Sequence, residues 1–561
     1  MSAEAPTIDS ERQQILAAKQ EGLGATCSTY VKMSGPGWLQ GAITLGGGSL
    51  AGSLYLGVLA GYQLMWLQLV AMVLGIVMLS AISYVTLSTG KRPFALINSQ
   101  LNPVLGWSWA IAVMMANLVW CLPQFALGTA AVQQNLIPSL DGDAGKVVIG
   151  GVLLVVASVL IWFYDSGSRG IVLFERILKV MVAIIVMSFV GVVITLTFSS
   201  AGLPWGEILQ GFIPDLGMFN RISTELAEQV KQSSAPEFWQ SKILSEQRNV
   251  MVTAVATAVG INMTFLLPYS MLRKRWDKDF RGLAIFDLSI GLFIPFLLAT
   301  SCVVMASASQ FHAKYDPAVI ERGGGAYEDN LNAFIDARLI SAGKQPTDAN
   351  RALIEPSNKD KELAAMLIRR DASSLAMSLE PLTGAAVSHF VFGLGVLAMA
   401  TSTIIILMLI NGFTLCEMLG RPNSVNIHRL GCLMVGVVGF AGPFLWTGRT
   451  KFWLAVPTST FGMMLLPIAY VTFFLMMNSR NILGADLPKG RRRVLWNALM
   501  LVALGFACYG AYVSIMGKTD LIFGVQVRWL ALGVYAVLGI LGVLLHRTGG
   551  KGPDAPAIYK T

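Results

Sequence analysis

The sequence predicts an all-α polytopic membrane protein of about 12 transmembrane helices, built as a 5+5 inverted repeat with broken helices 1 and 6. The first observation is composition: 54% of the 561 residues are hydrophobic and only 13% are charged, where a globular chain carries about 25%. The second is a series of apolar windows of about 20 residues, each long enough to cross a bilayer. The third is an interruption in the middle of two of those windows.

Twelve apolar windows are the predicted spans, and they account for most of the chain. They cover residues 36–60, 63–87, 104–133, 146–164, 171–198, 248–272, 282–308, 384–415, 430–446, 452–477, 494–515 and 526–546. The predicted domains are a cytoplasmic N-terminal segment 1–34, spans 1–7 in 35–308, an extracytoplasmic insert 309–383, spans 8–10 in 384–478, and spans 11–12 with the tail in 479–561. In the insert we expect two or three amphipathic helices.

Basic residues in the short loops predict the orientation. Lys and Arg gather in the loops that are cytoplasmic if the N-terminus is inside, as in Arg273–Arg275 and Arg491–Arg493, and this bias sets topology. Residues 1–30 contain no apolar signal segment, so the first span directs insertion. We expect a multi-pass protein of the plasma (inner) membrane whose partners are the lipid bilayer and a small solute or ion, as a monomer or homodimer. The net charge of +9 follows from the basic loops, so no nucleic-acid partner is expected.

The first span is interrupted at its centre by Gly46-Gly47-Gly48-Ser49. Each Gly costs a helix about 1 kcal/mol relative to Ala, and a loosened backbone in hydrocarbon leaves polar groups without partners. Such a break is tolerated where it lines an enclosed or water-filled cavity, as in secondary transporters. Close helix packing at small residues is the alternative. The sixth span has matching interruptions at Gly260, Asn262, Thr264 and Pro268.

Several motifs, in order along the chain, resemble the Nramp metal transporter family. The stretch 35–66 opens with GP, contains GxxxGY and ends in Leu-Met-Trp, close to the family's Leu-Leu-Trp. TGK at 89–91, GTA at 128–130, FERILKVMVAIIV at 174–186, ATSTI at 400–404 with Glu417, and LLPIAYVTFFLMMNSRNILG at 465–484 also agree. The resemblance covers most of 35–484 apart from the insert. It implies a leucine-transporter-like fold and secondary active transport of a divalent metal.

The departures from the family pattern concern the metal site itself. Gly46–Ser49 stand where the family has Asp-Pro-Gly-Asn, and Ile261, Asn262 and Met263 stand where it has Met-Pro-His. The two acidic residues of the family's third helix correspond to Leu122 and Phe125, and a Gln of its tenth helix corresponds to Ser459. The resemblance therefore implies a metal transporter without the family's carboxylate, thioether and proton-relay acids at their usual positions.

The predicted substrate site consists of neutral groups at the two breaks and on the spans facing them. Its members are Gly46, Gly47, Gly48, Ser49, Gly260, Asn262, Met263, Thr264, Ser402, Thr403 and Ser459. A dehydrated divalent ion needs charged ligands, so we expect a hydrated or hard ion such as Mg²⁺. A small organic anion, zwitterion or amino acid held by free N–H groups at a half-helix N-terminus is the alternative. A membrane scaffold or sensor that transports nothing is the second alternative.

Four polar residues within the spans are candidates for binding a coupling proton or Na⁺: Asp287, Gln124, Asn117 and His389. An ionisable residue inside a span is a functional candidate by default. The structural alternative is that Asp287 pairs with Arg281 or Lys278. By the same reasoning, Glu175 pairs with Arg176 and Lys179, and Glu417 with Arg421, on their own helices.

No enzymatic function is expected. The sequence contains no GxxxxGK[ST] phosphate loop, no HExxH and no GxSxG, which excludes an ATP-driven pump of that type within this chain and the common hydrolases. Six scattered Cys show no metal-binding spacing, so no cofactor and no resident metal are expected.

Overall fold

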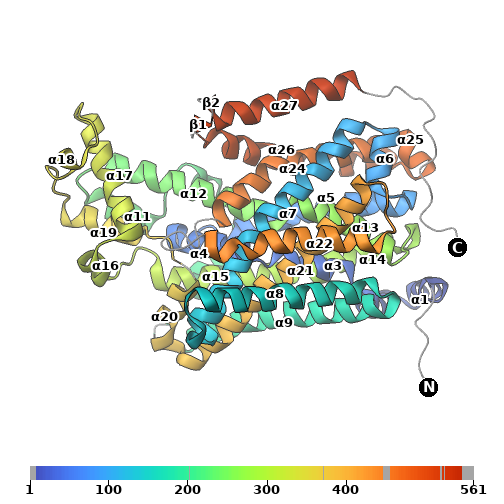
Figure 1. Cartoon of the computed structure of the whole chain (residues 1–561), viewed down its shortest axis with the longest axis horizontal. Helices are drawn as coiled ribbons and strands as arrows, with labels where there is room; N and C mark the ends of the chain where they lie inside the picture. Colours follow the sequence, from blue (N-terminus) through green and yellow to red (C-terminus); the bar gives the residue numbers. More distant parts are fainter. Residues whose placement is uncertain are drawn as a thin grey trace.

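The structure is a computed structural model that describes residues 8–200, 202–370, 372–445, 455–518, 521–522 and 525–545; side chains are not described at 168, 455–460 and 521–522. Long helices form an elongated bundle (Figure 1). Helix α1 (Ile8–Glu21) lies at one end and helices α16–α19 at the other (Figure 1). We call these ends the N-terminal face and the insert face.

The described residues contain eleven helices long and apolar enough to cross a membrane, or twelve when the bent pair α3 and α4 counts as one span. This confirms the predicted number. The spans are α3 (Pro36–Thr44) with α4 (Gly47–Ala60), α5 (Met65–Thr89), α7 (Pro103–Ala131), α8 (Gly142–Asp165), α9 (Ser168–Thr197), α12 (Pro236–Ala258) with α13 (Ile261–Arg273), α14 (Arg281–Leu288) with α15 (Ile294–Phe311), α21 (Phe392–Met418), α22 (Val425–Phe440), α24 (Ala455–Asn478), α26 (Gly490–Met516) and α27 (Val527–Leu544).

The remaining elements are short helices, irregular helical turns and one small hairpin. The short helices are α2 (Leu23–Met33), α6 (Pro93–Gln100), α10 (Trp205–Gln210), α11 (Thr224–Lys231), α16 (Pro317–Arg322), α17 (Gly325–Ser341), α18 (Asp348–Arg351), α19 (Asn358–Met366), α20 (Ala372–Thr383), α23 (Gly442–Leu445) and α25 (Arg480–Leu483). Wide π turns occupy Val132–Leu136, Ser289–Phe293 and Ala386–Val391, and 3₁₀ turns Pro138–Leu140, Leu216–Phe219, Lys278–Phe280 and Gly484–Asp486. Strands β1 (Leu521–Ile522) and β2 (Val525–Gln526) pair antiparallel.

The first span is broken where the glycines predict a break. Helix α3 ends at Thr44, Gly46 is extended, and α4 starts at Gly47. The two halves meet at an angle of 52°. Helix α3 lies in backbone contact with the seventh span, because a Cβ added at Gly41 would lie only 2.1 Å from the carbonyl oxygen of Gly291. Only glycine permits that approach.

The sixth span is interrupted as well, although less sharply. Helix α12 ends at Ala258 and α13 begins at Ile261, with Val259 and Gly260 extended between them. Helix α12 starts at Pro236, ahead of the apolar window that begins at residue 248. Its polar first half continues the helix beyond the apolar window and packs against the insert helices.

The insert holds more helices than the two or three expected. Helices α16 to α20 all lie between residues 317 and 383. Asp360 is fully buried at the start of α19 and accepts hydrogen bonds from Ser234, Trp239 and Ser357. The stacked rings of Trp239 and Phe334 join α12 to α17. The insert is therefore built onto the outward extension of α12.

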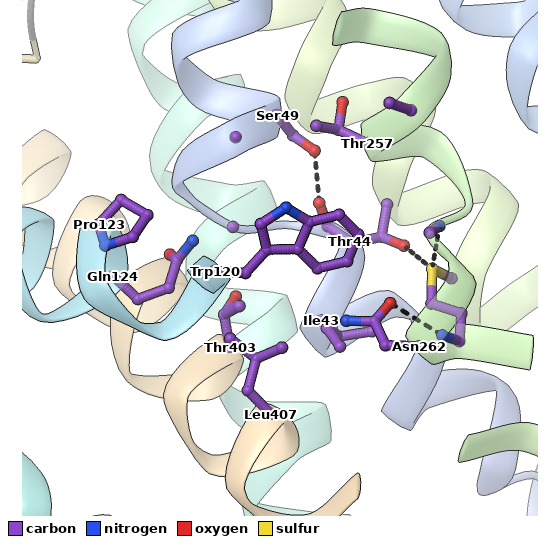
Figure 2. A pocket seen from close by; sticks show the side chains of 15 residues that line it. Ile43, Thr44, Ser49, Trp120, Pro123, Gln124, Thr257, Asn262, Thr403 and Leu407 are labelled. Carbon is purple, nitrogen blue, oxygen red and sulfur yellow. Dashed lines mark hydrogen bonds between the residues drawn. The ribbon is translucent and has the colours of Figure 1, made fainter. Parts of the chain in front are cut away.

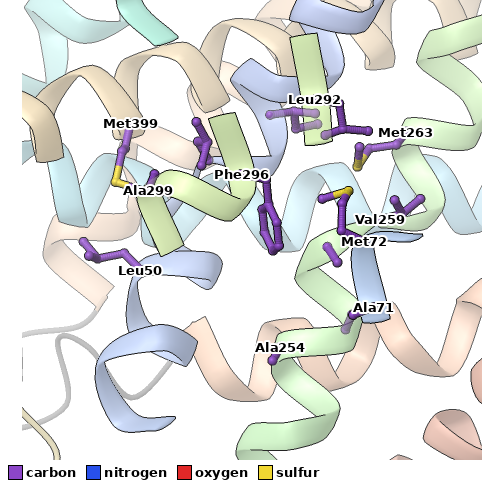
Figure 3. Close-up of a cluster of buried hydrophobic side chains, with 14 of the residues drawn as sticks. Leu50, Ala71, Met72, Ala254, Val259, Met263, Leu292, Phe296, Ala299 and Met399 are labelled. Carbon is purple, nitrogen blue, oxygen red and sulfur yellow. The ribbon is translucent and has the colours of Figure 1, made fainter. Parts of the chain in front are cut away.

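The core lies between the broken spans and their neighbours. Leu50 of α4, Met72 of α5 and Ala254 of α12 meet Phe296 of α15 and Met399 of α21 in this cluster (Figure 3). These side chains are buried. Because apolar residues pack around both broken helices, the polar groups at the breaks are enclosed by protein.

Candidate functional site

A cavity lies between the two helix breaks, in the middle of the bundle. The space between its lining atoms is about 450 Å³ when the part open to solvent is included, and about 50 Å³ of it is wide enough for the centre of a water molecule. Its described lining comes from four spans (Figure 2): Ile43, Thr44, Gly46, Gly48, Ser49, Trp120, Pro123, Gln124, Ala256, Thr257, Gly260, Asn262, Met263, Thr403 and Leu407. The two breaks face each other across a polar cavity, as predicted.

The break in the first span is held by hydrogen bonds of neutral groups. The Ser49 hydroxyl donates to the carbonyl oxygen of Thr44 at 2.5 Å, which joins the two half-helices. The Gly47 N–H donates to Gln124 Oε1 at 2.9 Å, so the start of α4 is anchored to α7. A Cβ at Gly46 would lie 2.7 Å from Thr403 Oγ1, which explains why only glycine fits there.

Met263 closes the break in the sixth span. Its Sδ lies 3.1 Å from the hydroxyl of Thr44 and accepts the Gly260 N–H at 3.4 Å. The Asn262 side-chain oxygen accepts the Met263 N–H at 2.9 Å, while its Nδ2 is buried without a partner among the described residues (Figure 2). The thioether is thus engaged by protein donors, and the Asn262 amide donor is free to face a solute or water.

Trp120 lies across the centre of the cavity (Figure 2). A Cβ at Gly260 would lie 2.5 Å from its ring, and one at Gly462 would lie 2.0 Å from it. The indole is therefore clamped between glycines of α24 and the sixth-span break. Its ring sets the width of the cavity.

Among the residues that the structure describes, no charged side chain lines the cavity. Across the described part of the chain there is also no cluster of three or more His, Cys, Asp or Glu side chains able to hold a metal ion. The described lining offers hydroxyl, amide, thioether, backbone and ring groups beside aliphatic side chains. Such a site can hold a solute by neutral hydrogen bonds, and it cannot neutralise a bare divalent ion.

Eight predicted residues line the cavity: Gly46, Gly48, Ser49, Gly260, Asn262, Met263, Thr403 and Gln124. Gly47 contributes through its N–H bond to Gln124. Thr264 lies outside the lining, where its hydroxyl accepts from Trp109 Nε1 at 2.9 Å. The Ser402 hydroxyl donates to the Ala42 carbonyl at 3.0 Å. The side chain of Ser459 lies outside the described residues.

Three candidates for coupling lie away from the cavity. Asn117 is buried on α7, and neither of its amide atoms has a partner among the described residues. His389 contacts Glu380 at 3.0 Å on a partly exposed surface. Asp287 is buried in α14 near the N-terminal face, where it accepts from backbone amides of the first span.

The ion pairs expected from neighbouring positions on single helices were wrong. Arg281 pairs with Asp486 at 2.9 Å instead of with Asp287. Glu175 pairs with Lys274 at 3.1 Å. Glu417 similarly pairs with Arg92, at 2.8 Å. For the two glutamates, a cation from another part of the chain replaces the one expected on the same helix, because the loops of the N-terminal face bring cations over the helix ends.

Seven lining residues were not predicted: Ile43, Thr44, Trp120, Pro123, Ala256, Thr257 and Leu407. A signal existed for two of them. Trp120 lies four residues before Gln124 on α7, so both share one face of that helix. Thr44 lies just before the glycine run, where a half-helix must end.

The chain matches the family model described as natural resistance-associated macrophage protein-like (Nramp) over residues 37–328 and 361–513. It is 29% identical over 161 residues to "Metal transporter Nramp2" of Oryza sativa subsp. japonica, which is 28% of this chain and 29% of that relative. It is 28% identical over 162 residues to "Metal transporter Nramp2" of Populus trichocarpa, 28% of each chain. The aligned stretch thus spans less than a third of either relative.

Solved structures of a manganese transporter from Eremococcus coleocola share the fold. A mutant form aligns with a TM-score of 0.62, 13% identity and 97% coverage of both chains. Its complex with an aromatic bis-isothiourea substituted compound aligns with a TM-score of 0.60, 13% identity and the same coverage. At this identity the likeness shows the fold alone, and it confirms the predicted leucine-transporter-like architecture of a multi-pass membrane protein.

Proposed function

This chain belongs to the Nramp family, and from that premise we propose that it is a secondary active transporter of a metal cation that stays hydrated, with Mg²⁺ as the best candidate. The cation would cross by alternating access through the cavity between the two breaks. The observation that carries the proposal is a cavity between two interrupted spans whose described lining contains no carboxylate.

Hydration is what reconciles a metal substrate with a neutral cavity. Mg²⁺ gives up its water reluctantly and is usually bound with several waters in place. The cavity offers about 50 Å³ to the centres of water molecules, and each bound water needs about 10–15 Å³ of such space. A few waters therefore fit in this arrangement, and a fully hydrated ion requires the cavity to widen as it opens. The hydroxyls of Ser49, Thr257 and Thr403 and the amides of Gln124 and Asn262 would contact those waters.

The broken spans supply the mechanical part of the proposal. Each half-helix can tilt about its break without disturbing the backbone of its other half, so the cavity can open towards one face at a time. Helices α3 and α13 lead from the cavity to the N-terminal face, and α4 and α12 lead to the insert face. The two pairs are the moving parts in this proposal.

The orientation is proposed from charge. Arg273–Arg275 and Arg491–Arg493 lie beside or within the ends of α13 and α26 at the N-terminal face, and basic loops stay in the cytoplasm. We therefore place this face in the cytoplasm and the insert outside, in the plasma (inner) membrane. A coupling ion, proton or Na⁺, is part of the proposed cycle.

A small organic anion or zwitterion is the second candidate. The N–H groups of Gly48 and Ser49 in the first turn of α4 have no acceptor among the described residues. With the unpartnered Nδ2 of Asn262, they form a set of donors that suits a carboxylate. The Gly47 N–H is not part of that set, because Gln124 already accepts from it.

The test is uptake by purified protein in liposomes. Mg²⁺ entry is followed with mag-fura-2, and Mn²⁺, labelled amino acids and labelled dicarboxylates are assayed in parallel. The metal proposal predicts Mg²⁺ entry above empty liposomes. Uptake of an amino acid or acid alone would support the second candidate, and no uptake of any probe would favour a scaffold or sensor.

A charge placed in the cavity separates the candidates more sharply. A carboxylate introduced at position 49 would be repelled by the Thr44 carbonyl oxygen, to which Ser49 now donates. Gln124→Glu avoids this repulsion and is therefore the cleaner change. Its carboxylate keeps an acceptor for the Gly47 N–H. We expect it to lower the KM for Mg²⁺ and Mn²⁺ by about tenfold or more and to abolish anion uptake; Gln124→Met is the matched uncharged control.

A further inference from the structure

Asp287 differs from the other buried carboxylates of the N-terminal face in how its charge is balanced. Glu417 pairs with Arg92 at 2.8 Å, and Glu175 pairs with Lys274 at 3.1 Å. Asp287 is 1% exposed, and within the described part of the chain no Lys, Arg or His nitrogen lies within 4 Å of it. Burial without a paired cation disfavours the ionised form of a carboxylate, whereas hydrogen-bond donors favour it, so the charge of Asp287 depends on the groups that donate to it.

The charge of Asp287 is held by the backbone of the first span. Its Oδ1 accepts the Gly35 N–H at 3.1 Å, and its Oδ2 accepts the Gly37 N–H at 2.7 Å. A Cβ at Gly37 would lie 2.1 Å from the Asp287 carbonyl oxygen, so the two backbones touch. Both amides belong to the start of α3, whose N–H groups have no partner within the helix.

The charged groups around Asp287 are occupied elsewhere. Lys274 and Glu175 face it from α13 and α9 and pair with each other. Lys179 of α9 is also near, and its ammonium donates to the Ser34 carbonyl at 2.6 Å. Glu11 of α1 lies near the Lys274–Glu175 pair, and Arg176 lies near Lys179, both at longer range. None of these cations neutralises Asp287 directly.

We propose that Asp287 is a proton-binding site whose protonation releases the inner half-helix α3. The ionised carboxylate accepts two N–H groups and fixes α3 against α14. A proton from the aqueous phase at the N-terminal face converts one oxygen into a hydroxyl donor, and an N–H then loses its acceptor. When the proton leaves, the carboxylate forms again and recaptures α3.

The proton site can affect transport because the far end of α3 reaches the cavity. Ile43 and Thr44 end that helix and line the cavity, so release of its first turn frees one wall of the cavity. Proton binding at Asp287 would in this way be coupled to opening towards the N-terminal face. This last step rests on the proposed transport function; the proton site itself does not.

Hydrogen–deuterium exchange tests the proton site without any substrate. Full-length wild-type protein is measured between pH 5 and 8, with rates corrected for the intrinsic pH dependence. We expect peptides covering 33–41 to lose protection at least fivefold as pH falls, and Asp287→Asn to show the low protection at every pH. Glu417→Gln, a buried carboxylate held by Arg92, should leave the pH response of α3 intact. Protection that stays constant across this range in wild type overturns the proposal.

Proton movement with Mg²⁺ tests the coupling. Liposomes containing pyranine report protons that move when Mg²⁺ is added, and Mg²⁺ exchange at equal pH shows that each variant is folded. We expect an Asp287→Asn protein that still exchanges Mg²⁺ to move no protons, whereas the Glu417→Gln protein should move them. Proton movement by Asp287→Asn at the wild-type ratio overturns the coupling. Absent Mg²⁺ transport by wild type would count against the proposed function alone, since the exchange experiment decides on Asp287.

Discussion

Arg369 is expected to restrain the two outer half-helices that border the cavity. Its guanidinium pairs with Glu246 of α12 at 2.5 Å and lies 5.0 Å from the centre of the Tyr55 ring of α4. The Tyr55 hydroxyl in turn donates to the Leu367 carbonyl at 3.5 Å. Through one side chain the insert thus holds α4 and α12 together at the insert face, and Arg369→Ala should release them.

The size of the effect follows from burial. The side chains of Arg369 and Glu246 are 14% and 22% exposed, so the pair is intermediate between a surface ion pair and a buried one. A surface pair contributes about 0–1 kcal/mol, and disrupting a buried pair costs about 3–5 kcal/mol. The cation–π contact adds about 1 kcal/mol. If about 2 kcal/mol of this total favours the clamped arrangement, its loss shifts the ratio of clamped to released molecules about 30-fold.

Cysteine labelling from the insert face measures that shift. Thr257→Cys reports access to the cavity, in a background where the exposed Cys27 and Cys508 are changed to Ser. Arg369→Ala should raise the rate of modification by a membrane-impermeant maleimide about tenfold or more. Arg351→Ala is the matched control, because Arg351 pairs only within the insert. Equal labelling rates in the Arg369→Ala and Arg351→Ala proteins would refute the clamp.

Three further outcomes are expected. Gly260→Ala forces a methyl to within 2.5 Å of Trp120 and should cut Mg²⁺ uptake at least tenfold, whereas Gly260→Ala combined with Trp120→Ala should recover part of it; failure of the double variant to recover any uptake contradicts this. Gly41→Ala, whose methyl would lie 2.1 Å from the Gly291 oxygen, should lower stability by about 1–3 kcal/mol, seen as a lower midpoint in thermal unfolding. Burial raises the pKa of Asp360, but hydrogen bonds from neighbouring side chains outweigh it and hold the pKa below its usual value, so the stability it adds to the insert is present at neutral pH and lost as pH falls below about 3.9; limited proteolysis of the insert should accelerate there in wild type, and Asp360→Asn should be cut faster already at pH 7.

The spans and the two breaks could be predicted because their signals are local. A bilayer demands about 20 apolar residues, and Gly46–Ser49 weaken a helix wherever they occur. An apolar window does not locate the start of α12, because the first turns of this helix, from Pro236, are polar. That half-helix is stabilised by packing of Trp239 against Phe334, a contact between residues far apart in sequence that no local window reports.

The cavity could be predicted only where the chain itself breaks. Gly46 and Asn262 lie at the interruptions, and both line it. Trp120 carries no such mark, since a Trp within an apolar helix usually faces core or lipid. Its place depends on Gly260 and Gly462, which leave room for the indole from two other spans. That complementarity exists only in three dimensions.

The distribution of charge is the strongest constraint on what the proposed transporter can move. Within the described part of the chain, the buried carboxylates lie near the N-terminal face or in the insert, and the cavity lining has none. Moving a bare ion into a low-dielectric interior costs of order 20 kcal/mol before compensation, and several kcal/mol after relaxation. Neutral hydroxyls and amides such as those of Ser49 and Asn262 offset only part of that cost. A cation that passes this cavity must therefore carry its own compensation as water, and Gln124→Glu, which supplies the missing charge, should help an ion that sheds water readily, such as Mn²⁺, more than Mg²⁺.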